Sequence, residues 1–375
     1  MTSAGWKWVA GAAIVLAAVL GYANTLEGQW VWDDVSSVLL HKHVQDPTQF
    51  LRLFQEDQHK FGRGQGNFYR PLVSASFMLD YAVTGGPPPS ETEAAGKSHP
   101  DVPTLVFHLS NMLWHALAAL LLFALLLRVG APLLVGTAAT LVYVAHPLHT
   151  EAVAYISGRA DMMSATFMFA GICLVISDRN GPGQWSAWAL SLFCFIFALL
   201  SKESSLIYPV LLVIAVLAVE FSKDRETRRY WLKLPPIVGA VAVLLVYVLL
   251  RSTVLKFAAP TATSATALSQ RLLETCQAYA LYIQLLFWPT HLHMERTLDG
   301  VPGWMAGVGA LLLLLTFVCV GIAWGKKQYR IAAGLIWFIA AWAPISGIFP
   351  LNAPMAEHWM YVPMAGFCWA TRWSS

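Results

Sequence analysis

Two adjacent carboxylates, in the run Trp30-Val31-Trp32-Asp33-Asp34, are the first residues whose type and spacing suggest chemistry. Neighbouring carboxylates can share a proton or bind a cation, and either arrangement makes one of them a candidate general base. A solvated acidic loop or a helix N-cap would use the same residues. Side chains of neighbouring residues in an extended segment point apart, so only one is expected to face a substrate. Trp32 would share the face of Asp34 and anchor it at an interface, which favours Asp34.

Two basic residues are candidates for holding a phosphate. Arg70 lies between Tyr69 and Pro71, and a guanidinium fixed in this way can bind a phosphate through two N–H groups or extend toward a membrane interface. Lys202 precedes Glu203. It can bind a phosphate as a point charge, or the two residues can form a structural pair between helices.

The densest group of polar residues lies between 146 and 161. Its members are His146, His149, Glu151, Tyr155, Arg159 and Asp161. Pro147 is expected to begin a helix in which Glu151, Tyr155 and Arg159 recur every four residues and share one face. With histidines near the helix N-terminus, this face can form an anion site with acid–base groups. A hydrogen-bond network that only joins helices, or a His-x-x-His metal site, would use the same residues.

Further polar residues occur near both ends of the apolar part of the chain. Glu357 and His358 follow a late apolar run, on the same predicted side as the residues above, which suggests one composite site. His108, Asn111 and His115 are spaced i, i+3, i+7. They form a stripe that is expected to face neighbouring helices and to bond with them.

The composition shows which kind of protein must position these residues. The chain has 375 residues, 57% of them apolar and 12% charged, with a net charge of +3. A soluble domain carries about 25% charged residues. A soluble enzyme, a disordered chain and a nucleic-acid binder are therefore excluded, and a polytopic membrane protein is predicted. The five cysteines lie in apolar stretches without paired spacing, as expected for small core residues.

The predicted fold is an all-α membrane helix bundle with about ten to eleven hydrophobic segments. The apolar runs lie at 8–23, 105–127, 132–145, 162–177, 185–200, 206–221, 236–255, 304–324, 331–349 and from 361 onward. The run 8–23 also resembles a cleavable signal peptide. The run 273–288 is ambiguous, because Glu274, Gln277 and Gln284 interrupt it.

The distribution of lysine and arginine predicts the orientation. The segments 223–233 and 326–330 are basic and should be cytoplasmic, together with Lys7 and Arg128. Both segments lie on one side only if 273–288 does not cross, so we interpret it as a re-entrant or interfacial helix within an outer loop, 256–302. The largest polar segment, 24–104, is then the first outer loop. It contains the acidic motif and an irregular turn at 85–89, followed by a polar insert.

Seven motifs, taken in order, resemble one family. They are Val31-Trp32-Asp33-Asp34, Tyr69-Arg70-Pro71-Leu72, Phe107-His108-Leu109-Ser110-Asn111, His146-Pro147-Leu148-His149, Gly158-Arg159-Ala160-Asp161, Ser201-Lys202-Glu203 and Ala356-Glu357-His358-Trp359. The series is similar to the transmembrane-and-tetratricopeptide-repeat O-mannosyltransferase-like family of the GT-C glycosyltransferase superfamily. The resemblance covers nearly the whole chain, so residues 1–375 are expected to form a GT-C-like transmembrane domain. Family members continue into a repeat array, and this sequence is interpreted as a bacterial-type member without one.

The resemblance implies a function and a site. The implied reaction is inverting transfer of a mannose-like sugar from a polyprenyl-phosphate donor to a protein hydroxyl. It would take place at the periplasmic face of a bacterial inner membrane, or in the endoplasmic reticulum lumen of a eukaryote. Asp33 or Asp34 would act as the base. The residues expected to bind the donor phosphate are Arg70, His146, His149, Arg159 and Lys202. The residues expected to support the site are Glu151, Tyr155, Asp161, Glu203, Glu357 and His358. No metal ligand and no nucleic-acid partner is assigned, and a need for a divalent cation is left open.

Two functions from other classes compete with the transferase. A transporter would show repeated halves and charges near the membrane midplane, whereas here the charges lie at helix ends and no repeat is visible. An inactive membrane anchor for a repeat domain would keep the fold without the chemistry. Substitution of Asp33 and Asp34 separates an enzyme from an anchor, and an uptake assay in vesicles tests the transporter.

Overall fold

The computed structural model describes residues 3–61, 67–85, 102–177, 182–228, 230–255, 267–294, 296–349, 351 and 353–370. Within these ranges the chain is helical, and the only pairing of the β type is an isolated bridge between Arg296 and Met355. Most of the turn predicted at 85–89, the polar insert after it and the last five residues, 371–375, lie outside the described ranges.

The helices follow the apolar runs of the sequence. The first half of the chain forms α1 (Ser3–Gly21), α2 (Pro71–Thr84), α4 (Leu105–Arg128), α5 (Leu133–Ala145), α6 (Thr150–Ala154) and α7 (Arg159–Val175). The second half forms α8 (Pro182–Leu199), α9 (Tyr208–Phe221), α10 (Leu234–Thr253), α11 (Leu268–Phe287), α12 (Trp304–Gly325), α13 (Tyr329–Trp342) and α14 (Tyr361–Trp369). Every apolar run predicted above is matched by one of these helices.

Five helical segments of the described chain are long and apolar enough to cross a membrane. They are Ala4–Glu27, Leu105–Arg128, Glu203–Phe221, Tyr230–Thr253 and Trp304–Gly325. Three further apolar helices are shorter, at Leu133–Ala145, Gly183–Leu199 and Tyr329–Ile345. The all-α membrane class is therefore confirmed, whereas a count of ten to eleven segments is not. The helix α11, which covers the ambiguous run 273–288, is not among the five.

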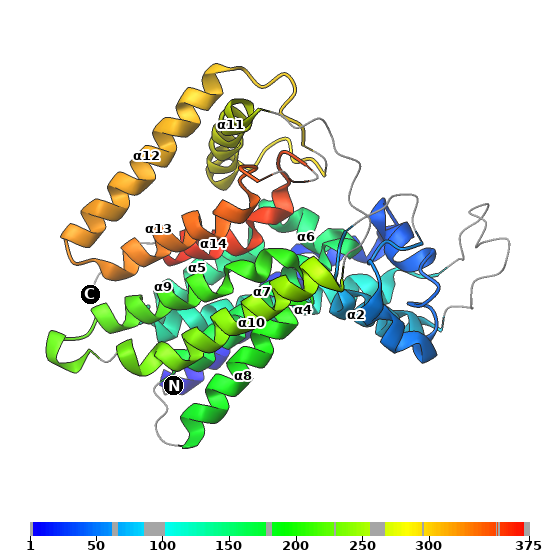
Figure 1. Ribbon diagram of the computed structural model, residues 1–375, viewed down its shortest axis with the longest axis horizontal. Helices are drawn as coiled ribbons and strands as arrows, with labels where there is room; N and C mark the ends of the chain where they lie inside the picture. The colour runs from blue at the N-terminus through cyan, green and yellow to red at the C-terminus, as the bar shows by residue number, and fades with distance from the viewer. Residues whose placement is uncertain are drawn as a thin grey trace.

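Helix α4 is the centre of the bundle, where α1, α5 and α7 pack against it (Figure 1). The predicted polar stripe of α4 does face its neighbours. Asn111 Nδ2 donates to the Val153 and Tyr155 carbonyls at 3.1 and 3.0 Å, and His115 Nδ1 lies 2.7 Å from the Tyr361 hydroxyl. These bonds join α4 to the 146–161 segment and to α14.

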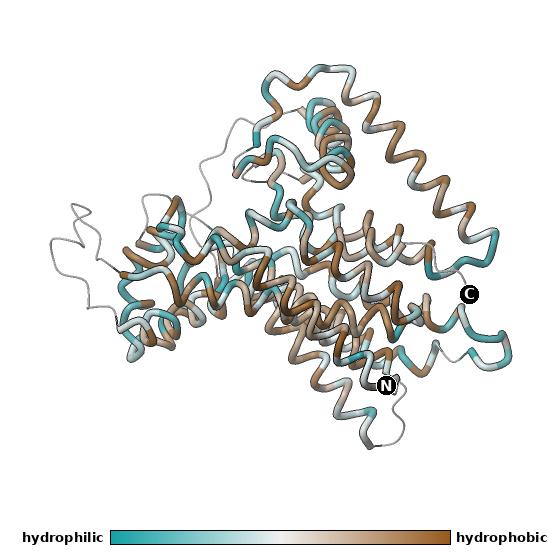
Figure 2. The backbone as a smooth tube through the Cα atoms, turned by 180° about the vertical axis from the view of Figure 1, so that it is seen from behind, coloured by the Kyte–Doolittle hydropathy of each residue, from teal (hydrophilic) through white to brown (hydrophobic). Residues whose placement is uncertain are grey.

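The helix α12 lies at the edge of the bundle, where it packs on α11 and α13 (Figure 1). Only 11% of its apolar window is buried within the protein. Its path is apolar almost throughout (Figure 2). An apolar helix with an exposed surface of this kind requires a hydrocarbon environment, which agrees with a membrane protein.

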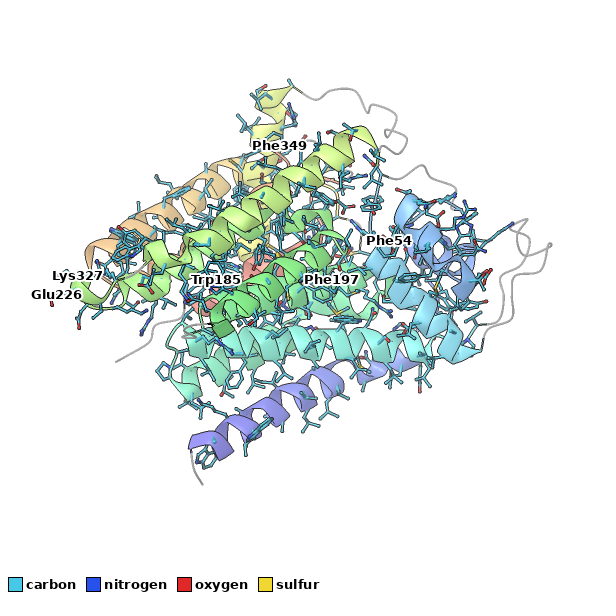
Figure 3. All side chains as sticks on the ribbon, turned by 60° about the horizontal axis from the view of Figure 1, so that its bottom comes forward. Phe54, Trp185, Phe197, Glu226, Lys327 and Phe349 are labelled. Carbon is cyan, nitrogen blue, oxygen red and sulfur yellow. The ribbon has the colours of Figure 1, made fainter. Side chains whose placement is uncertain are left out.

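The basic loops meet at one end of the bundle, which we call the basic end and define by Arg128, Lys223, Lys233, Lys327 and Arg330. The ring of Phe221 lies 5.4 Å from Trp324, and Lys233 Nζ donates to the Val175 carbonyl at 2.9 Å. Lys327 and Glu226 lie together at this end, and Phe54 of the first loop lies at the opposite one (Figure 3). The segments that the charge rule assigns to one side of the membrane are therefore neighbours.

Candidate functional site

The acidic motif lies in a tight helical turn and not in the extended segment assumed from the sequence. Asp33 and Asp34 begin a turn that continues into the π-helical turn Val35–Leu39. Trp32 has a φ of +51°, in the left-handed region that L-residues rarely adopt. The extended segment in which Trp32 would share a face with Asp34 therefore does not form. Uncommon backbone conformations of this kind concentrate at functional sites.

Asp34 is fully buried and bonds two segments of the site to each other. Its Oδ1 accepts the Ser157 N–H at 2.8 Å, and its Oδ2 accepts the Val31 N–H at 3.3 Å. Burial raises the pKa of the Asp34 carboxyl to about 7, against the opposing effect of the Ser157 bonds. These contacts tie the first loop to the 146–161 segment, so both carboxylate oxygens are engaged within the protein.

Asp33 has the opposite arrangement, with a fixed backbone and an exposed side chain. Its N–H donates to the Tyr155 hydroxyl at 3.2 Å, and its carbonyl accepts the Ser37 hydroxyl at 2.7 Å. The Ser37 hydroxyl also lies 2.8 Å from that of Ser157. The backbone of Asp33 is thus fixed while its side chain is exposed, so of the two acids Asp33 is the one open to a substrate.

The 146–161 segment is broken into short pieces and is not one continuous helix. It consists of the 3-10 turn Pro147–His149, α6, an extended residue at Tyr155 and the 3-10 turn Ile156–Gly158 before α7. Asn111 takes up carbonyls that would bond within a helix. A Cβ at Gly158 would lie 2.6 Å from the Ala152 carbonyl oxygen, so only glycine fits there. The predicted common face of Glu151, Tyr155 and Arg159 therefore does not form.

Arg159 lies inside the protein, fully buried, and not at a donor-binding surface. Its guanidinium meets Asp80 Oδ2 at 2.5 Å, Asn111 Oδ1 at 2.7 Å, the Phe107 carbonyl at 2.9 Å and Ser76 Oγ at 3.1 Å. These partners lie on α2 and α4, and Arg159 begins α7. Arg159 therefore joins three helices, and binding of the donor phosphate by this residue stays a prediction.

The two histidines of the segment also point inward. His146 Nδ1 accepts the Leu148 N–H at 3.2 Å, and its Nε2 lies 3.1 Å from the Leu286 carbonyl oxygen. His149 is fully buried, with its ring 4.5 Å from that of Tyr143 and 4.6 Å from that of Tyr361. Both imidazoles thus pack within the protein, and their binding of a phosphate stays a prediction.

The structure does bring four of the other predicted residues together. Lys202 Nζ donates to both Asp161 oxygens at 2.6 Å. Asp161 Oδ2 lies 3.9 Å from His358 Nε2, and His358 Nδ1 lies 2.7 Å from Glu151 Oε1. The resulting chain of contacts joins α6, α7, the connection between α8 and α9, and the segment before α14. One alternative from the sequence was a pair between Lys202 and Glu203. In the structure Lys202 pairs with Asp161 instead.

Glu203 instead holds Arg70. Arg70 Nε donates to Glu203 Oε2 at 3.0 Å, and the Tyr69 N–H donates to Glu203 Oε1 at 3.0 Å. The side chain of Arg70 keeps 16% of its surface exposed. Burial lowers the pKa of the Lys202 ammonium, Asp161 raises it and the charge of Arg70 lowers it further. Arg70 and Lys202 are thus connected through Glu203, which holds Arg70 and follows Lys202 in the chain.

His59 was not predicted from the sequence. It bonds the turn that begins with Asp33 and is under the charge of Arg70. Its Nδ1 lies 2.8 Å from the Ser36 hydroxyl, and its own N–H donates to Asp57 Oδ1 at 2.8 Å. Burial lowers the pKa of the imidazole, Asp33 raises it and Arg70 lowers it, so both charges act on this ring. A single histidine in a long polar loop has no spacing signal that would have singled it out.

Glu357 is held by a residue that the sequence also did not reveal. Its Oε1 accepts the Arg296 guanidinium at 2.7 Å and the His293 N–H at 2.9 Å. Both donors lie between α11 and α12. Glu357 therefore fixes that connection to the rest of the protein.

Among the described residues, no group of three His, Cys, Asp or Glu side chains is arranged to hold a metal ion.

Comparisons with known proteins agree with the resemblance seen in the motifs. The chain is 23% identical to a protein O-mannosyl-transferase of Caenorhabditis elegans over 95% of its length, and 25% identical to protein O-mannosyl-transferase TMTC3 of Homo sapiens over 92%. It is 32% identical to protein O-mannosyl-transferase Tmtc2 of Drosophila melanogaster over 54% of its length. The chain spans 49% and 40% of the first two proteins. No family model matches it.

Proposed function

We propose that this chain, a relative of the protein O-mannosyl-transferases, is a membrane glycosyltransferase that moves a mannose-like sugar to a protein hydroxyl. One observation supports this function above all. The exposed carboxylate of Asp33, whose backbone is fixed, acts together with the charge of Arg70 on the ring of His59, and Lys202 directly precedes Glu203, the partner of Arg70. Base and cations of this kind are what a transfer from a phosphate-linked sugar needs.

The donor in this proposal is a polyprenyl-phosphate sugar. Its lipid lies in the membrane beside the apolar helices, and its phosphate lies at their end. Arg70 and Lys202 would share their N–H groups between Glu203, Asp161 and the phosphate, since a guanidinium has five donors and an ammonium three. The carboxylates of Glu203 and Asp161 then keep the two cations in place while no donor is bound.

The chemical step uses the carboxylate of Asp33 as the base and the cations of Arg70 and Lys202 for the leaving phosphate. Asp33 accepts the proton of the acceptor hydroxyl, the hydroxyl oxygen forms a bond to the anomeric carbon, and the bond from that carbon to the phosphate oxygen breaks. The polyprenyl phosphate leaves with the electron pair, and Arg70 and Lys202 stabilise its charge. Attack from the face opposite the leaving group inverts the anomeric centre, as in the GT-C class.

The proposal also assigns a side of the membrane. The site lies at the end of α4 opposite the basic end, because Asn111 bonds the Tyr155 region near the start of α4 and Arg128 ends it. If the basic end is cytoplasmic, as the positive-inside rule requires, the site faces the periplasm of a bacterium or the lumen of the endoplasmic reticulum.

The function is tested by offering the purified protein in lipid vesicles three labelled donors, polyprenyl-phosphate mannose, polyprenyl-phosphate glucose and nucleotide-linked mannose, with a serine- and threonine-rich protein as the acceptor. We expect label on the protein from the first donor, released by mild alkali as an O-linked sugar. Label from the nucleotide sugar alone would contradict the lipid donor. No label from any donor, with vesicles that accumulate free sugar, would favour a transporter.

A further inference from the structure

A cavity at the basic end is separate from the site described above. Its volume is about 460 Å³, and it lies between the connection after α9 and the connection from α12 to α13. Four cationic side chains line it, Lys223, Arg228, Lys327 and Arg330, against a single carboxylate in the lining, Asp224. Lys223 is also paired with Glu220, outside the lining, at 2.7 Å. A concave site with such an excess of positive charge attracts an anion.

The cations are held in place by the backbone around them. Arg228 donates to the Phe221 carbonyl at 3.1 Å and to the Lys223 carbonyl at 3.3 Å. The guanidinium of Arg330 lies against Gly130, where a Cβ would come within 2.6 Å of it. The φ of Gly130 is +96°, so the loop after α4 is shaped to admit this side chain. Two guanidinium groups fixed in this way suit the oxygens of a phosphate.

Lys327 occupies a position that glycine usually fills. Its φ is +59°, and its N–H donates to the Trp324 carbonyl at 2.9 Å, at the point where α12 ends. A left-handed residue after a helix is most often glycine, because other residues are strained there. The chain nevertheless places a lysine at this point, and the side chain lines the cavity.

The surroundings indicate a lipid as the source of the anion. The rings of Phe221, Trp324 and Tyr329 lie 5.2 to 5.6 Å from one another beside the cavity. Tryptophan and tyrosine concentrate at the membrane–water interface. The exposed apolar surface of α12 begins next to this group, so acyl chains would have a surface to follow. Basic cavities between membrane helices on the cytoplasmic side bind anionic lipid head groups.

We propose that this cavity binds the phosphate of an anionic phospholipid head group. The bound lipid would join the connection after α9 to the connection between α12 and α13, which meet here through the contact of Phe221 with Trp324. It would thereby hold the α11–α13 part of the protein against the bundle. The proposal does not depend on the transferase activity, because no residue of the cavity belongs to the site of Asp33.

The test measures binding of three probes to the full-length protein in a neutral detergent: short-chain phosphatidic acid, short-chain phosphatidylcholine and inorganic phosphate. Lys327→Gln removes one cation of the cavity and shortens the side chain by one atom. Lys326→Gln is the matched control, since Lys326 is exposed, adjacent and not part of the lining. Arg228→Gln is a second variant, and thermal melting without probe shows that each variant is folded.

We expect the wild-type protein and Lys326→Gln to bind phosphatidic acid equally. Lys327→Gln and Arg228→Gln should each bind it about tenfold more weakly, as expected for the loss of one charge-assisted contact. Added salt should weaken binding, because it screens the charges. Equal binding by Lys326→Gln and Lys327→Gln would overturn the proposal, as would equal binding of phosphatidylcholine. Inorganic phosphate that binds as tightly as phosphatidic acid would overturn the lipid as the source.

Discussion

Replacing Arg159 by methionine tests whether this residue supports the fold or binds the donor. Arg159→Met removes the ion-pair partner of Asp80, which is 4% exposed and, among the described residues, keeps the Ser110 hydroxyl at 2.6 Å. It also leaves Asn111 Oδ1 and the Phe107 carbonyl without their donor. Breaking a buried ion pair from one side costs about 3–5 kcal/mol, because a buried charge remains uncompensated. We therefore expect the melting temperature to fall by roughly 5–15 °C.

The assay is thermal unfolding in detergent, followed by tryptophan fluorescence. Arg128→Met, at the exposed end of α4, is the matched control and should leave the melting temperature unchanged. The double variant Arg159→Met with Asp80→Leu should recover most of the loss, since replacing both members of a buried pair by apolar residues is close to neutral. If Arg159→Met melts like the wild-type protein but no longer binds polyprenyl phosphate, the structural role is wrong and Arg159 is a donor ligand.

Three further predictions concern the buried carboxyl of Asp34, the cations proposed to bind the donor, and the orientation of the protein in the membrane. The buried Asp34 has a pKa of about 7, raised from 3.8, so its contribution to stability is full below pH 3.8 and is lost as the pH rises through 7. The melting temperature of Asp34→Asn should therefore improve relative to the wild-type protein between pH 5 and pH 8, and a constant difference would refute the shift. Glu203→Gln should raise KM for the donor about tenfold with a smaller change in kcat, because it releases Arg70; steady-state kinetics that show an unchanged KM would contradict this. In cells, a cysteine at Gln55 should react with an impermeant maleimide and one at Glu226 should not, and the reverse labelling would invert the orientation.

The apolar runs predicted the helices well, because a membrane-spanning segment can be recognised from its length and composition alone. The polar stripe of His108, Asn111 and His115 was also readable, since a helix has a fixed period. The gathering of the basic loops at one end follows from the same reasoning, because a helix that spans the bundle carries the chain from one end to the other. Such features depend on local sequence and need no knowledge of partners.

The roles of the polar residues were not readable in the same way. Spacing placed Glu151, Tyr155 and Arg159 on one face, but Asn111 on another helix captures the carbonyls that would continue that helix. Arg159 looked like a surface cation because its partner Asp80 lies 79 residues earlier in the chain. Which carboxylate meets which cation is decided by tertiary contacts, and a motif does not record them.

Tertiary structure also limits what the sequence predicts about Asp33 and Asp34. The identification of this pair depended on residue type and adjacency, and its place in a catalytic site stays a prediction. The choice between them depended on an extended backbone, whereas Trp32 has a left-handed conformation that turns the chain into a helical turn. That turn buries Asp34 and exposes Asp33, so the structure reverses the preference.

The most direct test of the account is the rate of sugar transfer by Asp33→Asn. The substitution keeps the size of an exposed side chain and removes its ability to accept a proton, so folding and donor binding should be unchanged. We predict that kcat for transfer from polyprenyl-phosphate mannose to a protein hydroxyl falls by about 10²–10⁴-fold, as is typical when a general base is lost. A folded Asp33→Asn variant that transfers the sugar at the wild-type rate would contradict the assignment of the base and the mechanism built on it.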